Sequence, residues 1–289
     1  MHNHTNKSDD GTESPQTVLE NFEAENLVAA AITDHDTFAG VNEVLASKRQ
    51  RSVGILPAVE ISAECQGIPI EILGYFGSDY KKLDDSGIIK PVLVKDAGAE
   101  LLVEKLRKQG IIIDPFDKYY RDAGIMPFVA THSELQEKHG ELLAGIDTKL
   151  VCTSKDDKVI GKSTKYLFRE HIFQKESPLA VDFGGRLPSA EEVIRIIRDF
   201  GGDAILAHPF DYGEKSAYRI LECLKGKVDG VECHHQTASG EKLEYLLQLC
   251  AQHGLLVTGG SDFHGRLGGA INSQKVPAQL IKQFDGKIL

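Results

Sequence analysis

Short apolar runs alternate with amphipathic segments along most of the chain. Amphipathic helical patterns occupy residues 14–27, 189–202 and 241–254, and the first two open with the serine and proline chemistry that favours helix starts. The apolar runs have the length of buried strands and end in polar residues; they cover 28–36, 53–62, 70–76, 203–209, 229–235 and 255–264. Helices followed by short apolar strands are typical of parallel β/α units. The pattern predicts an α/β fold with a closed, barrel-like sheet.

The middle of the chain breaks this rhythm. It is richer in Lys, Asp and Glu, shows few buried strands and contains one clear amphipathic helix at 96–110. A composition shift of this kind predicts an inserted, mostly helical subdomain at 77–186. The barrel domain would then be formed by 1–76 and 187–289.

The composition is that of a soluble globular protein, with 41% hydrophobic and 26% charged residues among 289. No apolar run reaches the roughly 18 residues needed to span a bilayer, and no basic segment followed by an apolar stretch opens the chain. We therefore expect a cytoplasmic protein without a membrane partner. The cysteines are odd in number and scattered without a C-x-x-C pair, which favours buried reduced thiols over disulfides or a cysteine zinc site; they are Cys65, Cys152, Cys223, Cys233 and Cys250.

The net charge of −10 restricts the class of partner. Binding along a long nucleic acid depends on Lys and Arg that neutralise phosphates, so an acidic chain is a poor candidate for it. A small phosphorylated ligand remains compatible, because bound cations can supply positive charge locally.

The chain opens with MHNHTNKSDDGT, in which His2 and His4 stand two positions apart and Asp9 and Asp10 follow. On a strand, residues i and i+2 face the same side, so this H-x-H would aim two imidazoles at one point. Only Met1 precedes the pair. Either the strand that carries them is very short, or the sequence lacks a few upstream residues.

Nearly every predicted strand ends in His, Asp or Glu. The residues concerned, with the opening cluster, are His2, His4, Asp9, Asp10, Asp34, His35, Asp36, Glu60, Glu71, His208, Glu232, His234, His235, Asp262 and His264. In a barrel these strand ends converge on one face. Taken singly, each residue has an ordinary explanation as a buried histidine or a turn aspartate. Together they predict a site for divalent cations.

The donor types narrow the choice of cation. Imidazole and carboxylate donors without thiolates suit Zn²⁺, Mn²⁺ or Fe²⁺, and there are too many donors for a single ion. Three divalent ions would carry about +6, whereas the carboxylates of Asp10, Glu60, Glu71 and Asp262, if all are ligands, would carry about −4. The remainder of about +2 matches a phosphate monoester dianion.

The stretches HNHT…SDDGT…P, AITDHDT, VEIS, ILGYF, ILAHP, DGVE and VTGGSDFHG resemble, in order, the motifs of the PHP (polymerase and histidinol phosphatase) superfamily of metal-dependent phosphoesterases. The resemblance covers about 1–76 and 187–270. It implies a distorted (β/α)7 barrel with a site for two or three metal ions. The central segment sits where the nucleotide phosphatases and related exoribonucleases of that family carry an insertion.

The resemblance also implies a distribution of ligands over the ions. His2 and His4, with Glu60 and Asp262, would hold one ion; the first-loop aspartate, His35 and His264 would hold another; and Glu60 would bridge to a third, which also takes His208. The stretch SDDG has one residue more than the common SDG. Counting back from Gly11 and Pro15 favours Asp10 as the ligand, and counting forward from His4 favours Asp9.

The chain departs from the family pattern at two places. Glu71 stands where relatives usually have histidine; it can still bind a cation, with added negative charge. The stretch Ala130-Thr131-His132 stands where relatives that cleave nucleotides tend to have Arg-Thr-His. His132 is a candidate for phosphate contact or leaving-group protonation, or an ordinary histidine at a helix start.

Three further sites have two explanations each. Arg266, after SDFHG, could clamp a phosphate oxygen or face solvent. One of Asp34 and Asp36 could orient the imidazole between them, and the other could cap a helix. One of His234 and His235 could reach the substrate, or both could be structural.

The sequence thus predicts a metal-dependent phosphoesterase, in which a metal-bound hydroxide attacks a phosphomonoester or nucleotide-like substrate. The alternatives are an exonuclease-type phosphodiesterase acting on short oligonucleotides, and a regulatory module with a degenerate site. Metal-dependent C–N hydrolysis is a further alternative; such enzymes typically use a carboxylated lysine as a bridge, and no lysine ends a predicted strand here.

Overall fold

The computed structural model describes residues 1–110, 137, 177–265 and 270–289. The chain forms two compact units. One comprises Met1–Cys65, Ile70–Val92 and Leu187–Leu289, and the other comprises Gln66–Pro69 and Leu93–Arg186. The subdomain boundaries drawn from the sequence, at 77 and 186, stay a prediction.

Six strands form one mixed sheet in the order β1-β2-β3-β4-β5-β6. They are β1 (Ala29–Ile32), β2 (Gly54–Cys65), β3 (Ile68–Tyr75), β4 (Asp203–Leu206), β5 (Gly230–His234) and β6 (Leu256–Gly259). The pairs β1–β2, β4–β5 and β5–β6 are parallel, and β3 runs antiparallel to β4. The turn between β2 and β3 is Gln66–Gly67, and both residues have positive φ, 56° and 79°, as a type I′ hairpin turn requires. The predicted α/β class is confirmed.

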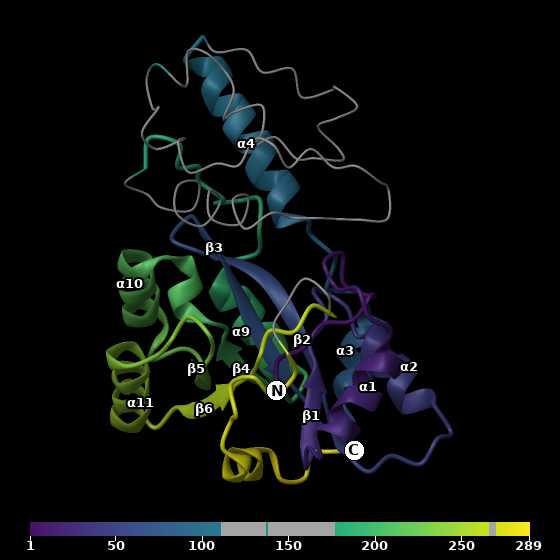
Figure 1. The fold of residues 1–289 in the computed structure, drawn as a ribbon. Coiled ribbons are helices and arrows are strands. Elements are labelled where there is room, and N and C mark those ends of the chain that lie inside the picture. Colours follow the sequence, from purple (N-terminus) through teal and green to yellow (C-terminus); the bar gives the residue numbers. More distant parts are fainter. Residues whose placement is uncertain (111–136, 138–176, 266–269) are drawn as a thin grey trace. The chain divides into compact units, whose positions relative to one another are not determined.

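Helices flank this sheet, and the predicted helices at 14–27, 189–202 and 241–254 are among them. The helices of the first unit are α1 (Pro15–Ala24), α2 (Ala39–Ala46), α3 (Tyr80–Ser86), α9 (Ala190–Asp199), η2 (Pro209–Tyr212), α10 (Glu214–Leu224), α11 (Glu241–His253) and η4 (Ala278–Phe284). Ser14 and Ser189 cap α1 and α9 by accepting the backbone N–H groups of Thr17 and Glu192. In Figure 1, α1, α2 and α3 gather beside β1, and α10 and α11 lie together beside β5 and β6.

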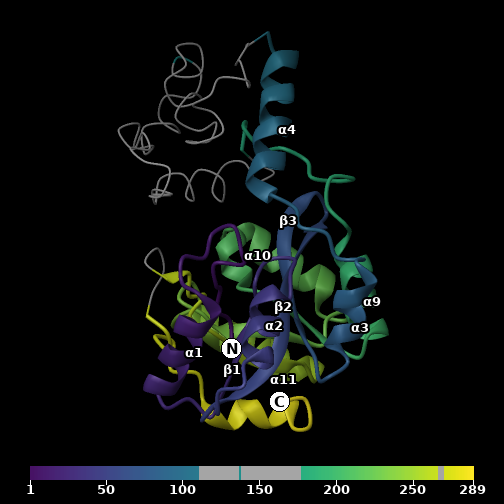
Figure 2. The same ribbon diagram turned by 90° about the vertical axis from the view of Figure 1, so that its right-hand side faces the viewer.

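The interior of the sheet is apolar at one end and polar at the other. Alternate residues of β2 point inward, so Leu56 and Ala58 enter the core and Glu60 follows them on the same face. The core cluster consists of Ala31, Leu56, Ala58, Leu73, Tyr75, Ile205, Ala207 and Phe284. Phe284 belongs to η4, which lies across the lower end of this unit in Figures 1 and 2. The packed end leaves the opposite end for the polar strand termini.

The residues that open the chain join the two edges of the sheet. Asn3 forms a parallel bridge with Phe263, beyond the end of β6. On its other side, Thr33 N–H donates to the Asn3 carbonyl at 2.9 Å, just beyond β1. The bonds from His4 N–H to Phe263 O (2.7 Å) and from Asp262 N–H to His2 O (3.1 Å) extend the pairing. The H-x-H segment therefore pairs with the chain beyond the ends of both β1 and β6.

The second unit contains α4 (Val94–Lys108), where the sequence predicts a helix at 96–110. Within this unit Lys105 Nζ donates to Ala180 O at 2.6 Å, and Phe183 N–H donates to Gly67 O at 3.1 Å. His132 and the preceding Ala130-Thr131 lie outside the described residues. Among the residues that the structure does describe, no helix is both long and apolar enough to cross a membrane.

Candidate metal centre

The polar strand ends meet around the buried carboxylate of Glu60. Its Oε2 lies 3.2 Å from Nε2 of His2 and 3.1 Å from Nε2 of His4. The same oxygen lies 3.3 Å from Nδ1 of His35. Its other oxygen, Oε1, lies 3.1 Å from Nε2 of His208. Glu60 thus faces four imidazoles from three separate segments of the chain.

Four buried residues form the first donor group: His2, His4, Glu60 and Asp262. The Nε2 atoms of His2 and His4 are 3.1 Å apart, and Oδ1 of Asp262 lies 3.3 Å from the first and 3.4 Å from the second. Ligands at 2.0–2.1 Å around a tetrahedral ion are about 3.3 Å from one another. The spacing is therefore that of donors arranged around one zinc-sized cation.

A second group lies beside the first. Asp10 Oδ2 is 3.2 Å from Nε2 of His264 and 3.5 Å from Nε2 of His35. The His4 and His264 rings stack at 4.2 Å, so the two groups share a wall of imidazoles. Asp9, by contrast, is exposed and is not a member of any donor group in the described part of the chain. The structure thus brings Asp10, His35 and His264 together, which is the second set of ligands that the family resemblance implies. Of the two candidate aspartates, Asp10 is the one in this group.

The third group combines two carboxylates with one imidazole. Glu71 Oε2 lies 3.4 Å from Nε2 of His208, the same atom that faces Glu60. Glu71 also belongs to a donor group with His35 and Glu60. Because β3 is antiparallel to its neighbour β4, the start of β3, rather than its end, reaches the polar end of the sheet. Glu71 enters the site for this reason, in the inward series that continues with Leu73 and Tyr75.

Further polar groups fix the orientation of the imidazoles. Nδ1 of His2 is 3.1 Å from both carboxylate oxygens of Glu232. Nδ1 of His4 is 3.1 Å from Ser8 Oγ, and that hydroxyl donates to Asp34 Oδ1 at 3.1 Å. Carboxylate–histidine contacts of this kind set the tautomer that leaves Nε2 free to bind a metal. They add a layer of support behind the first donor group.

Three non-glycine residues at the strand ends have left-handed backbone angles. The φ angles are 53° at Asp36, 21° at His208 and 49° at Asp262. Such angles cost on the order of 1–3 kcal/mol each and persist where the surroundings impose them. Close by, a Cβ on Gly260 would overlap the backbone and Cβ of His2. The backbone around the cluster is therefore held in a conformation that aims side chains inward.

Opposite charges dominate the electrostatics of the pocket. Burial disfavours the charged form of Glu60, but the His2 and His35 charges outweigh it and hold the pKa of the carboxyl well below its usual range. Burial likewise opposes protonation of His2, but Glu60, Glu232 and Asp262 raise its pKa well above its usual range. In His208, the hydrogen bond to Glu60 and the charge of Glu71 outweigh burial and raise the pKa to about 9. Without bound cations, protons on the imidazoles balance the carboxylates.

The unsatisfied atoms test whether a cation fits here. Glu60 Oε2, Asp10 Oδ1 and His264 Nε2 are buried and have no hydrogen-bond partner among the described residues. Buried polar atoms without partners are costly unless something else binds them. These atoms lie within the groups of donors that converge on common points. The donor set, the spacing and the unsatisfied atoms all fit divalent cations.

Asp34 and Asp36, on either side of His35, accept hydrogen bonds from neighbouring segments, and the sequence did not decide between their possible roles. Asp34 accepts hydrogen bonds from Thr5 N–H (2.6 Å), Thr5 Oγ1 (2.8 Å) and Ser8 Oγ (3.1 Å), and that serine hydroxyl in turn contacts the His4 imidazole and the His35 backbone N–H. Asp36 accepts from Ser62 N–H at 2.9 Å and Val92 N–H at 3.1 Å, so it ties neighbouring segments together.

The remaining candidates divide into three outcomes. His235 is buried, and its Nε2 lies 3.8 Å from Asp262 Oδ2, whereas His234 is partly exposed and is not a member of any donor group in the described ranges. Arg266, like His132, lies outside the described residues. Glu232 was named in the strand-end set without a role of its own, whereas Ser8 and Tyr212 were missed by sequence reasoning. The only available signal was the place of Glu232 in a predicted strand, because the other contacts depend on the three-dimensional fold.

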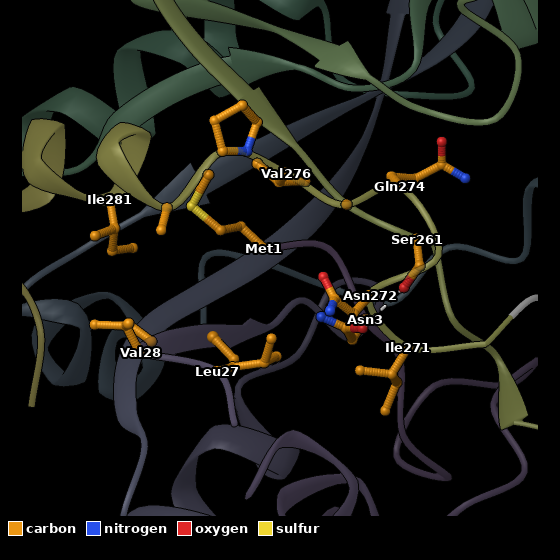
Figure 3. Close-up of a pocket in the computed structure, with 15 residues that line it drawn as sticks. Met1, Asn3, Leu27, Val28, Ser261, Ile271, Asn272, Gln274, Val276 and Ile281 are labelled. Atoms are coloured by element: carbon orange, nitrogen blue, oxygen red, sulfur yellow. Dashed lines mark hydrogen bonds between the residues drawn. The ribbon is translucent and has the colours of Figure 1, made fainter. Parts of the chain in front are cut away.

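A small cavity lies behind the N-terminal strand, away from the imidazoles (Figure 3). It has a volume of about 90 Å³ and is lined by Asn3, Ser261 and mainly apolar side chains, among them Leu27, Val276 and Ile281. His2, His4 and Asp262, which alternate with Asn3 and Ser261 along the chain, do not line it. The candidate chemistry therefore lies on the opposite face of this segment.

The sequence has relatives of established name over most of its length. It is 25% identical over 268 residues to a 5′-3′ exoribonuclease of Haemophilus influenzae, covering 91% of this chain and 89% of the relative. It is 24% identical to a phosphoribosyl 1,2-cyclic phosphate 1,2-diphosphodiesterase of Eggerthella lenta, covering 93% and 94%. It is also 24% identical to a 3′,5′-nucleoside bisphosphate phosphatase of Chromobacterium violaceum, covering 91% and 86%. No family model matches the chain.

Two solved structures share the fold. One, described as a metal-dependent phosphoesterase from Bifidobacterium adolescentis, has a TM-score of 0.57 at 22% identity and covers 98% of this chain and 93% of its own. The other, an amidohydrolase from Chromobacterium violaceum solved with bound sulfate and no metal, has a TM-score of 0.59 at 22% identity, with coverages of 100% and 96%. The fold and the relatives together define the class of hydrolytic phosphoesterases. They fit a PHP-type phosphoesterase family, as the motifs indicate.

Proposed function

We propose that this chain hydrolyses a phosphomonoester or nucleotide-like substrate at the cluster around Glu60. The observation that carries the proposal is the division of this one carboxylate between two donor groups. One oxygen faces His2 and His4 at 3.1–3.2 Å, and the other faces His208 at 3.1 Å. A carboxylate in that position suits a bridge between two cations, and clustered cations are a common basis of phosphoester hydrolysis.

The proposed ligands follow the three donor groups. The first cation would be held by His2, His4, Glu60 and Asp262, the second by Asp10, His35 and His264, and the third by Glu60, Glu71 and His208. Nitrogen and oxygen donors without thiolate favour Zn²⁺, Mn²⁺ or Fe²⁺. Among the described residues, Asp10 is the aspartate that supports this assignment, and Asp9 is not.

The bound cations would supply an activated water and positive charge for the phosphate oxygens. The residues of the chain supply the arrangement. Glu232 and Ser8 hold the His2 and His4 rings with Nε2 turned inward. With Glu232 and the buried Asp211 counted, six carboxylates against three divalent ions leave a net charge of about zero, so the loaded site would not repel an anionic substrate.

The substrate is proposed from the relatives. They are named for acting on a nucleoside bisphosphate, a phosphoribosyl cyclic phosphate and RNA ends, which supports a small phosphorylated substrate of nucleotide type. Exonucleolytic cleavage of short oligonucleotides is the second candidate, favoured by the exoribonuclease relative. The net charge of −10 disfavours a long nucleic acid. His132 and Arg266 remain proposed contacts to phosphate or leaving group, and the cytoplasm remains the proposed compartment.

Two other functions have less support. In C–N hydrolysis by the barrel mechanism considered above, a modified lysine would bridge the metals, but the donor groups of the described residues contain only His, Asp and Glu, with Glu60 at the centre. A regulatory module with a degenerate site would lack part of the donor set. Here every predicted ligand inside the described ranges except Asp9 enters a donor group or directly faces one of its members.

The test is an activity assay on the purified protein supplied with Mn²⁺. A nucleoside 3′,5′-bisphosphate, a cyclic phosphate, a short oligonucleotide, a simple phosphomonoester and an amide are offered in parallel. We expect hydrolysis of at least one phosphate ester, and loss of that activity in His35→Ala and Asp262→Ala with the fold retained. His253→Ala, at the exposed end of α11, is the matched control. Full activity with normal metal content in His35→Ala or Asp262→Ala would refute the proposal.

A further inference from the structure

The three donor groups differ in chemistry, and Glu71 causes much of the difference. The first group offers two imidazoles and two carboxylates, and the second offers imidazoles around Asp10. The third offers Oε1 of Glu60, Oε2 of Glu71 and Nε2 of His208. Carboxylates thus outnumber imidazoles in this group, as they also do in the buried group of Asp211, Asp262 and the same His208. Carboxylate-rich sites suit Mg²⁺ and Mn²⁺, whereas imidazole-rich sites suit Zn²⁺ and Fe²⁺.

The third group also contains the donor side chain with the largest exposed fraction, that of Glu71. The Glu71 side chain is 24% exposed, compared with 0–7% for the donors of the first group and 7–20% for Asp10, His35 and His264 in the second. A partly exposed ligand lets water reach the cation, which speeds exchange and suits ions that keep several waters, as Mg²⁺ does. The Glu60 carboxylate is shared with the first group. Retention of a third cation therefore depends on Glu71 and His208.

Tyr212 gives Glu71 a defined position despite this exposure. The buried hydroxyl of Tyr212 accepts the Glu71 backbone N–H at 2.9 Å and donates to Glu71 Oε2 at 3.4 Å. The Tyr212 ring also packs against His208, with ring centroids 5.6 Å apart. One tyrosine thus contacts both of the donors that Glu60 meets in the third group.

From these contacts we propose that the third position is a separate, exchangeable site for a hard divalent cation, Mn²⁺ or Mg²⁺, and that Glu71 determines this selection. The inference rests on the metal centre of the proposed function. The other two positions retain the softer ion, Zn²⁺, because their donors are richer in imidazole and their first group is enclosed. The protein then holds two firmly bound ions and one exchangeable ion of a different element.

Metal content tests this inference directly. The full chain is loaded with Zn²⁺, incubated with excess Mn²⁺, desalted and analysed by elemental mass spectrometry, with bound Mn²⁺ followed by its paramagnetic resonance signal. We expect two Zn and one Mn per chain in the wild type. Glu71→His should convert the third position to Zn²⁺ retention, and Glu71→Gln should lower Mn²⁺ affinity about 10-fold or more. Glu222→Gln, an exposed glutamate on α10, should leave the ratio unchanged.

The outcomes separate this inference from the proposed function. Three equally retained Zn²⁺ ions, or a Glu71→His variant with the wild-type Zn:Mn ratio, would overturn the selection by Glu71 and leave the metal centre in place. Fewer than two bound metal ions per chain after desalting would overturn the metal centre and this inference together. A second test uses Tyr212→Phe, which removes the hydroxyl beside Glu71 but keeps every proposed metal ligand. We expect bound Mn²⁺ to exchange faster in this variant than in the wild type. An unchanged exchange rate in that variant would contradict the role given to the tyrosine hydroxyl.

Discussion

Both carboxylate oxygens of Glu232 lie 3.1 Å from Nδ1 of His2. Glu232 is fully buried on β5, and His2 is fully buried in the N-terminal strand. The contact leaves Nε2 of His2 facing Glu60 and Asp262. A carboxylate behind an imidazole in this way raises the basicity of the ligand and fixes its tautomer. Glu232 therefore acts on the first cation position through His2.

Glu232 variants should weaken metal binding in a graded way. Glu232→Gln keeps a hydrogen-bond acceptor but loses the charge, whereas Glu232→Leu loses both. We expect affinity at the first position to fall by about 10-fold in the first variant and about 100-fold in the second. Competition with a chelator, read by metal content, measures this. Equal affinity in Glu232→Leu and wild type would show that His2 needs no such support.

Ser8→Ala should disturb two donor groups at once. The Ser8 hydroxyl donates to Asp34, contacts Nδ1 of His4 at 3.1 Å and accepts the His35 N–H at 2.9 Å. Its removal leaves buried polar groups without a partner, which costs on the order of 1–3 kcal/mol. Chemical unfolding should show this loss, together with weaker metal retention. Ser52→Ala, at an exposed position, is the control, and equal stability of the two variants would contradict the prediction.

The stability of the metal-free protein should depend on pH through His208. Its pKa is raised to about 9 from the usual 6.5, so protonation favours the folded state. The stabilisation is fully present below about pH 6.5 and is lost as the pH rises through about 9; it is on the order of 3 kcal/mol. Thermal unfolding of chelator-treated protein between pH 6 and 10 measures this loss.

Bound cations should reverse that trend. Metal ligands bind as deprotonated groups, so metal affinity rises with pH, and the loaded protein should not lose stability over the same interval. A His208→Gln variant, measured without metal, should show a flatter pH profile than the wild type. An identical profile would mean that other groups control the titration.

Gly260→Ala should damage the site through packing alone. A Cβ at this position would overlap the backbone and Cβ of His2, so either the N-terminal strand or the loop after β6 must shift. Overpacking of this kind typically costs about 1–3 kcal/mol, and here it would also displace an imidazole. Gly226→Ala is the matched control, because a Cβ at Gly226 meets nothing within 4 Å. Stability and metal content should fall in Gly260→Ala and not in the control.

Local patterns predicted the strands and helices that carry the site. The alternation of Leu56, Ala58 and Glu60 follows directly from the period of a strand, and the capping serines mark two helices in the sequence. Spacing alone could not choose between Asp9 and Asp10, because both positions fit one of the two counts. The choice depends on which carboxylate meets His264, a contact across 254 residues of chain.

Other parts of the site could not be predicted from the sequence, because they depend on contacts between residues that are far apart along the chain. The segment around His2 and His4 forms only an isolated bridge, from Asn3 to Phe263, and a hydrogen bond from Thr33, so it is too short for a periodic signal. The contact of Glu71 with His208 requires the antiparallel course of β3, which a helix–strand pattern does not reveal. The roles of His132 and Arg266 stay predictions.

The same few residues at the start of the chain complete the sheet and present His2 and His4. If this segment detaches from the strands on either side, Glu60 and Asp262 lose the two imidazoles that face them. Metal retention at the first position is therefore linked to closure of the sheet at the N-terminal segment.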